Sequence, residues 1–124
     1  MKIINELLVN DVNESIKFYK DFLNFEVVEA TGKPINWVRL ENDTAELMLE
    51  DYKNAINEFE KFPSKVNSSN LIKFKYSNIE DVRMLYNKGL NNNIKIFKDL
   101  KETDYGTTEF AILDCDNNII IISN

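Results

Sequence analysis

The feature that most constrains this chain is a repeated order of sequence signals. Asp11 and Glu14 form a D-x-x-E pair, in which a helix cap and the third helical residue satisfy each other's free amides. Ser77 and Glu80 form a similar pair 66 residues later. A short apolar run precedes each pair, and a helical stripe and three strand-like runs follow it. The sequence therefore predicts an α+β fold made of two tandem βαβββ modules.

Each predicted element has a periodicity of its own. The first helix carries an apolar stripe at helical spacing, Val12, Ile16, Tyr19 and Leu23, which Phe18 and Phe22 widen. The second helix carries Ile79, Val82, Leu85 and Tyr86 and ends near Gly89. The predicted strands are runs rich in β-branched and aromatic residues: 3–9, 25–31, 35–41, 44–50, 71–76, 94–99, 107–113 and 118–123.

A polar stretch separates the two halves. Residues 51–70 read as an internal linker, with a short helix around Asn54 to Phe62 that Pro63 breaks. We therefore expect one domain, residues 1–124, divided into module 1 (1–50), the linker (51–70) and module 2 (71–124).

Composition excludes several classes of protein. The 124 residues, 44% of them hydrophobic, are enough to fill one core. A net charge of -6 argues against nucleic acid, whose phosphates require clustered Lys and Arg. A single cysteine, Cys115, excludes an internal disulfide, and the sequence has neither a signal-like apolar start nor a run long enough to cross a bilayer. We expect a cytoplasmic protein with no nucleic-acid or membrane partner.

Two stretches resemble a known superfamily. The sequence LLVNDVNESIKFYKDFLNFEVVE resembles the opening module of the vicinal-oxygen-chelate superfamily, which includes glyoxalase I, extradiol dioxygenases, fosfomycin-resistance enzymes and bleomycin-resistance proteins. YGTTEFAILDCDNN is similar to the closing motif, an aromatic-Gly pair before E-F-A-I and D-P-D-G-N. Asn24, Cys115 and Asn117 depart from the pattern at loop positions, where Asn tolerates a positive φ. The resemblance spans nearly the whole chain and implies sheets that form a cup.

The resemblance also identifies four positions for metal ligands. In metal-dependent members one ligand comes from each of four strands, and these positions correspond here to Ile4, Glu46, Leu71 and Ile121. Three are aliphatic, and the chain has no histidine. Divalent metals need oxygen, nitrogen or thiolate donors. We therefore expect no metal site and no cofactor.

Strand alternation extends these four positions to a set of residues facing the cup. The candidate ligand-binding residues are Glu6, Trp37, Arg39, Glu46, Met48, Glu50, Lys73, Phe97, Tyr105 and Ile121. The opposite, helix-facing set is wholly apolar: Leu7, Val9, Val38, Leu40, Leu47, Leu49, Ile72, Phe74, Ile120 and Ile122. Aromatic faces beside carboxylates favour a flat, cationic or amine-bearing ligand, whereas Arg39 and Lys73 would favour an anionic group.

Three functions fit these observations. The first is a metal-free binding protein resembling bleomycin-resistance proteins, which sequesters an antibiotic or metabolite in a cup completed by a second subunit. The second is a lyase, isomerase or antibiotic-modifying enzyme of the same superfamily, with Glu6, Glu46 or Glu50 as a general base whose pKa burial raises; Glu46 is the weak catalytic candidate. The third is a scaffold without a small-molecule ligand. Exposed sheet edges favour a homodimer.

Overall fold

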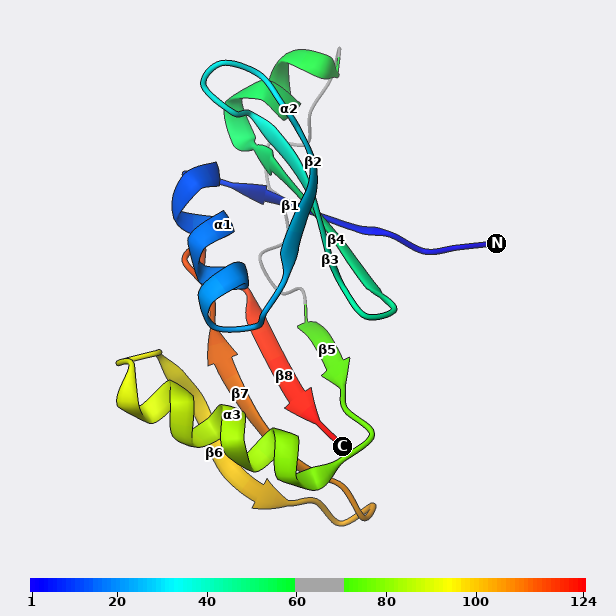
Figure 1. Ribbon diagram of the computed structural model, residues 1–124, viewed down its shortest axis with the longest axis vertical. Coiled ribbons are helices and arrows are strands. Elements are labelled where there is room, and N and C mark those ends of the chain that lie inside the picture. The colour runs from blue at the N-terminus through cyan, green and yellow to red at the C-terminus, as the bar shows by residue number, and fades with distance from the viewer. Residues whose placement is uncertain (60–70) are drawn as a thin grey trace. The chain divides into compact units, whose positions relative to one another are not determined.

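The computed structural model describes residues 1–59 and 71–124, which form two compact units within Met1–Val66 and Asn67–Asn124 (Figure 1). The elements of the first unit are β1 (Asn5–Val9), α1 (Val12–Asp21), β2 (Glu26–Thr31), β3 (Trp37–Asn42), β4 (Ala45–Asp51) and α2 (Tyr52–Glu58). Those of the second are β5 (Leu71–Lys75), α3 (Ile79–Asn91), β6 (Ile96–Glu102), β7 (Thr108–Leu113) and β8 (Ile119–Ser123).

The two units share one topology. The sheets have the strand orders β1-β4-β3-β2 and β5-β8-β7-β6. In each, the first strand pairs in parallel with the last, and the other pairs are antiparallel. A parallel pair needs a long crossover, and in each unit a helix and two strands lie between its members in sequence. The predicted tandem βαβββ fold is confirmed.

The core of the first unit lies between α1 and one face of its sheet. Val12, Tyr19 and Leu23 of the predicted helical stripe are buried. They meet the alternate strand residues, among which Val38 and Leu49 are fully buried. Burying each such side chain contributes about 1.5–3 kcal/mol. The period-3.6 stripe of the helix and the period-2 pattern of the strands thus hold the unit together.

The second unit repeats this arrangement around α3 (Figure 1). Val82 and Leu85 are buried on the helix, and the ring of Tyr86 meets that of Phe110 edge-on at 5.2 Å. Ile120 and Ile122 of β8 are fully buried beneath them. Alternation therefore leaves the other face of the sheet outside this core, as predicted.

The helix starts differ in part from the prediction. The Asp11 side chain accepts a hydrogen bond from the Glu14 amide at 3.1 Å, so the first cap is confirmed. The prediction of Ser77 as the second cap is wrong. Asn78 caps α3 instead, because its backbone is extended and its side chain accepts from the Glu80 amide at 2.9 Å. Asn caps as well as Ser, so spacing alone misplaced the start by one residue.

The helix expected from Asn54 begins at Tyr52, because the Asp51 carboxylate accepts hydrogen bonds from the amides of Lys53 and Asn54. Its expected end at Phe62, Pro63 and residues 60–70 of the linker lie outside the described residues. The division into two modules and a linker at residues 50 and 70 stays a prediction.

The two asparagines among the loop departures behave as predicted. Asn24 and Asn117 have φ values of 57° and 61°. Apart from glycine, asparagine is among the residue types that most readily adopt a positive φ, so the turns keep their shape. Within the described ranges, no helix is long and apolar enough to cross a membrane.

Candidate functional site

The open face of the first sheet lies opposite its core and carries the candidate residues predicted for this unit. We call this surface, made of Glu6, Trp37, Arg39, Glu46, Met48 and Glu50, the first-sheet face. Its cross-strand register places Met48 between Glu6 and Arg39, and Glu50 beside Trp37. The flanking Val38, Leu40, Leu47 and Leu49 are buried on the other side, so the predicted alternation of β3 and β4 is confirmed.

An acidic region of this face surrounds Trp37. The indole Nε1 of Trp37 donates a hydrogen bond to Glu6 Oε1 at 3.0 Å. Glu50 is only 5% exposed and accepts a hydrogen bond from Asn54 Nδ2 at 2.7 Å. Burial raises the pKa of Glu50 above its usual range; the Asn54 hydrogen bond opposes this, and the charges of Glu58 and Glu6 add to it. This carboxyl is therefore suited to accept a proton.

Salt bridges occupy the other region of the first-sheet face. Lys2 pairs with Glu46, and Arg39 Nη1 lies 3.7 Å from the same carboxylate. Arg39 also contacts Glu41 at 2.8 Å and Glu29 at 3.5 Å. The hydrogen bond from Lys2 lowers the pKa of Glu46, against the effect of burial and with further help from Arg39. The expectation that burial raises the pKa of Glu46 is therefore wrong, since neighbouring cations hold it ionised.

The second sheet also presents an organised polar surface. Lys73, Lys98, Tyr105 and Glu109 form what we call the second-sheet cluster. Glu109 is only 4% exposed. It lies 3.4 Å from Lys73 Nζ and 3.2 Å from Lys98 Nζ, and it accepts a hydrogen bond from the Tyr105 hydroxyl at 3.2 Å. Burial alone would raise the pKa of Glu109, but hydrogen bonds from Lys98, Lys73 and Tyr105 outweigh it and lower the pKa.

Glu109 and Lys98 were not among the site residues predicted from the sequence. The signal for Glu109 was present, because it is a single acid within the apolar run of β7. Alternation places it with Ala111, on the face opposite Phe110 and Ile112. Lys98 gave no such signal, since β6 is mostly exposed and has register irregularities near this residue.

The remaining predicted residues differ in how far their side chains are exposed to solvent. Ile4 precedes β1 and is exposed, as is Leu71 at the start of β5, and Ile121 is half-buried on β8. Phe97 is exposed at a register irregularity of β6. Tyr105 is also exposed, but its hydroxyl ties it to the second-sheet cluster. Within the described residues, no group of three or more His, Cys, Asp or Glu side chains is placed to hold a metal.

A hydrogen-bonded chain links Glu50 to an open hollow in the first unit. The hollow has a volume of about 350 Å³ and is lined by residues that include Lys33, Asn36, Lys53 and Asn54. Asn36 Nδ2 donates to Asn54 Oδ1 at 3.2 Å, and Asn54 in turn donates to Glu50. Asn54 therefore fixes the orientation of the buried carboxyl from the side of the hollow.

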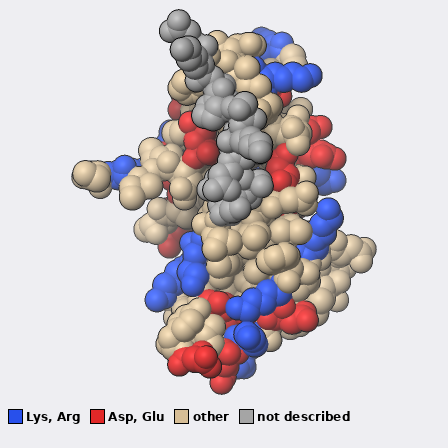
Figure 2. All heavy atoms as spheres, turned by 180° about the vertical axis from the view of Figure 1, so that it is seen from behind, with Lys and Arg blue, Asp and Glu red and all other residues tan. Residues whose placement is uncertain are grey.

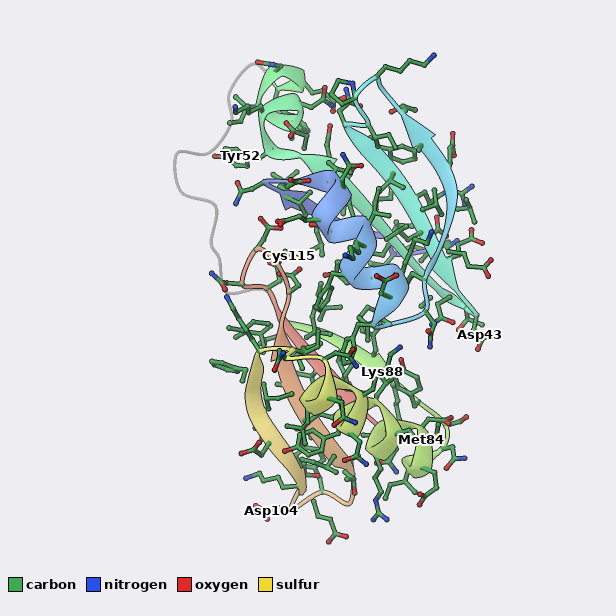
Figure 3. All side chains as sticks on the ribbon, turned by 60° about the vertical axis from the view of Figure 1, so that its left-hand side comes forward. Asp43, Tyr52, Met84, Lys88, Asp104 and Cys115 are labelled. Atoms are coloured by element: carbon green, nitrogen blue, oxygen red, sulfur yellow. The ribbon has the colours of Figure 1, made fainter. Side chains whose placement is uncertain are left out.

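Charged side chains of both signs also lie among uncharged ones on the surface of the molecule. In the view of Figure 2, groups of Lys and Arg side chains are interspersed with groups of Asp and Glu side chains. Cys115 lies exposed in the turn between β7 and β8, and Met84 and Lys88 lie on α3 (Figure 3).

The comparisons with known proteins agree with one another on the family of this chain. The glyoxalase-like domain family matches residues 2–124. Lactoylglutathione lyase from Agrobacterium tumefaciens is 16% identical, with a TM-score of 0.81, over 99% of this chain and 92% of that one. A glyoxalase/bleomycin resistance protein/dioxygenase family enzyme from Burkholderia phytofirmans is 18% identical, with a TM-score of 0.76, over 98% and 95% of the two chains.

A virulence protein from Salmonella typhimurium is 25% identical, with a TM-score of 0.73, over 99% of this chain and 94% of that one. No curated protein matches the chain. The family match covers nearly all residues, and the paired βαβββ units are those that the sequence motifs imply. The chain therefore belongs to the glyoxalase-like domain family of the vicinal-oxygen-chelate superfamily.

Proposed function

We propose that this chain is a metal-free binding protein for a planar small molecule, similar in role to bleomycin-resistance proteins, which sequesters an antibiotic or metabolite. One observation carries the proposal. Ile4, Leu71 and Ile121 occupy three of the four positions at which metal-dependent relatives place ligands, and the chain has no histidine. A single carboxylate, Glu46, is too few donors to hold a transition metal against water.

The first-sheet face supplies the side chains for binding. Trp37 offers a large apolar ring, and Glu6 fixes the orientation of that ring through the indole nitrogen. A rigid aromatic side chain with a fixed polar contact is typical of a ligand anchor. Met48, which lies between Glu6 and Arg39 in the register, adds an adaptable apolar surface. The proposal places this protein in the cytoplasm, as a homodimer.

Ligand titration tests this proposal. Native mass spectrometry of protein purified from its own host should show a bound small molecule, and planar compounds should shift the fluorescence of Trp37, the single tryptophan. Calorimetry should show that Trp37→Ala weakens binding by about 1–3 kcal/mol. Phe59→Ala, which removes an exposed aromatic ring outside the sheet, is the matched control. Equal affinity of the Trp37→Ala variant and the wild type would contradict the proposal.

Metal independence is tested separately. Because only one donor occupies the four ligand positions, elemental analysis after dialysis should find less than one transition-metal ion per ten chains, and a chelator should leave ligand binding unchanged. A stoichiometric metal that survives dialysis would overturn this part of the proposal.

One observation favours a second candidate, an enzyme without the usual metal site. Of the three carboxylates considered as a general base, Glu50 combines burial with a raised pKa, whereas the pKa of Glu46 is lowered. A base with a pKa nearer neutrality transfers protons more effectively. If the bound compound is turned over, Glu50→Gln should abolish turnover while the Trp37 fluorescence response remains. Binding without turnover would favour the sequestering role.

A further inference from the structure

We propose that the open face of the second sheet binds a singly charged organic carboxylate that has an apolar body. This inference rests on the proposed small-molecule binding and names the chemical class of the ligand. The evidence is the arrangement of apolar and basic residues in the rows that run across β5, β8, β7 and β6.

Two adjacent cross-strand rows form this surface. The first row is apolar, because the register places Leu71 beside Ile119 and Ile119 beside Leu113. Leu71 is 62% exposed, and the other two are half-buried. An apolar row that reaches the solvent on a strand is a surface on which a ring or a short alkyl chain can lie.

The second row carries a basic residue at each end. Lys73 pairs with Ile121, Ile121 with Ala111, and Ala111 with Lys98. At about 4.8 Å between strands, the two lysine backbones are about 14 Å apart. Both ammonium groups reach toward Glu109, which lies opposite Ser123 in the next row, because each is within 3.4 Å of its carboxylate. Ala111, which lies between them in the register, is buried.

The charges of the cluster favour an anion. Two ammonium groups face one carboxylate, so one positive charge is not balanced by Glu109. Each ammonium group has three donors, and its contact with Glu109 uses one. The lysine side chains are 45% and 41% exposed, so the remaining donors are accessible to a ligand. The excess of one charge matches a carboxylate better than a doubly charged phosphate.

Glu109 is poorly placed to attract a cation. It is buried, and its two oxygens already accept contacts from Lys73, Lys98 and the Tyr105 hydroxyl. Lys73 Nζ also lies 6.0 Å from the centre of the Tyr105 ring. The ring therefore stands beside the ammonium group that would bind the carboxylate, where it can contact a flat ligand body.

Three naphthalene compounds test the proposal: 2-naphthoate, 2-naphthylmethanol and 2-naphthylmethylamine. Calorimetry on the whole chain should show that naphthoate binds about tenfold more tightly than the alcohol, as expected for a charge-assisted contact, and that the amine binds least. Naphthoate should shift the methyl NMR signals of Leu71, Ile119 and Ile121. Its affinity should fall as salt rises, because the ammonium groups are exposed.

Variants identify the residues that bind the carboxylate. Lys73→Gln and Lys98→Gln should each weaken naphthoate binding about fivefold or more and leave the alcohol unaffected. Arg83→Gln is the control, because it removes the same charge from α3, which packs on the other face of this sheet. Leu71→Ser should weaken all three compounds to a similar extent. Thermal melting checks that each variant is folded.

Two outcomes would overturn the inference. The first is equal binding of naphthoate and the alcohol, or no binding of naphthoate. The second is unchanged naphthoate affinity in both lysine variants. Neither result would affect the proposed function if another planar compound shifts Trp37 fluorescence, because Trp37 belongs to the other unit. Loss of the Trp37 response with retained naphthoate selectivity would instead contradict only the role proposed for the first-sheet face.

Discussion

At the scale of single residues, two buried glutamates have opposite electrostatic surroundings. Glu109 lies among cations that lower its pKa, whereas burial and neighbouring acids raise the pKa of Glu50. A lowered pKa means that folding favours the ionised carboxylate, and a raised pKa means that folding favours the protonated form. The two residues should therefore contribute to the pH dependence of stability with opposite signs.

We predict that Glu109→Gln lowers the free energy of unfolding at pH 7 by about 1–3 kcal/mol, because two lysines lose their shared counter-charge. The folded pKa of Glu109 lies below its ordinary value of 4.5, so its contribution is present above that pH and is lost as the pH falls below it. Urea titrations should therefore show a smaller difference between variant and wild type at pH 3 than at pH 7. Glu102→Gln, at an exposed site at the end of β6, is the control.

We predict the opposite sign for Glu50→Gln. The folded pKa of Glu50 lies above 4.5, so its favourable contribution is present below that pH and is lost as the pH rises through the folded pKa. The variant should be more stable than the wild type at pH 7 by about 0.5–1 kcal/mol, because the glutamine oxygen can still accept the Asn54 hydrogen bond without a buried charge. A lower stability of Glu50→Gln at pH 7 would contradict this account.

At the scale of elements, each unit follows its main helix with an asparagine at positive φ. Asn24 has a φ of 57°, and the next residue, Phe25, donates its amide to the Tyr19 carbonyl at 3.0 Å. Asn93 has a φ of 54°, and Ile94 donates to Gly89 at 3.0 Å. The bond from Ile94 spans five residues, as in a common helix ending, whereas the bond from Phe25 spans six. The repeat therefore extends to the left-handed asparagine of these turns, although both positions lack glycine.

This ending gives a prediction for α1. Asn24→Ala should lower the free energy of unfolding by about 1 kcal/mol, because a β-carbon without a compensating polar group is strained at positive φ. Asn24→Gly should leave stability equal or higher, since glycine has no such strain. Thermal melts of the two variants check the prediction. Similar losses in both variants would mean that the Asn24 side chain, and not its φ, stabilises the turn.

Some features of the strands and helices could be predicted from the sequence, and others could not. The strands and their inward faces were predictable, because a strand with one buried side alternates with a period of two, as the buried Val38 and Leu40 alternate with Trp37 and Arg39. Helix starts were less predictable, because Ser77 and Asn78 are both good caps and local geometry chooses between them.

The polar networks were the least predictable feature. Lys2 reaches Glu46 across 44 positions, and Lys73 reaches Glu109 across 36. Long side chains from separate strands make these contacts, and no local pattern encodes them. The predicted strand face of Glu46 was therefore correct. The predicted direction of its pKa shift was wrong, since that direction depends on Lys2 and Arg39.

At the scale of the whole molecule, each sheet has edge strands with apolar side chains exposed to solvent. β2 is an edge of the first sheet, and both Val27 and Val28 on it are exposed. β6 is an edge of the second sheet, where Phe97 is exposed. An irregularity between Val27 and Glu29 interrupts the edge of β2, so side-chain contacts are favoured there over the addition of another strand.

We predict that the chain forms a homodimer through these edges, with the two-fold symmetry usual for a soluble homo-oligomer. Sedimentation at micromolar concentration should give twice the chain mass of 14.5 kDa. Val28→Lys should shift the mass toward one chain, because it places a charge in the apolar contact. Met84→Lys, on the exposed side of α3, should leave the mass unchanged. A wild-type mass of one chain would refute the prediction, and an unshifted dimer in Val28→Lys would exclude the β2 edge as the contact.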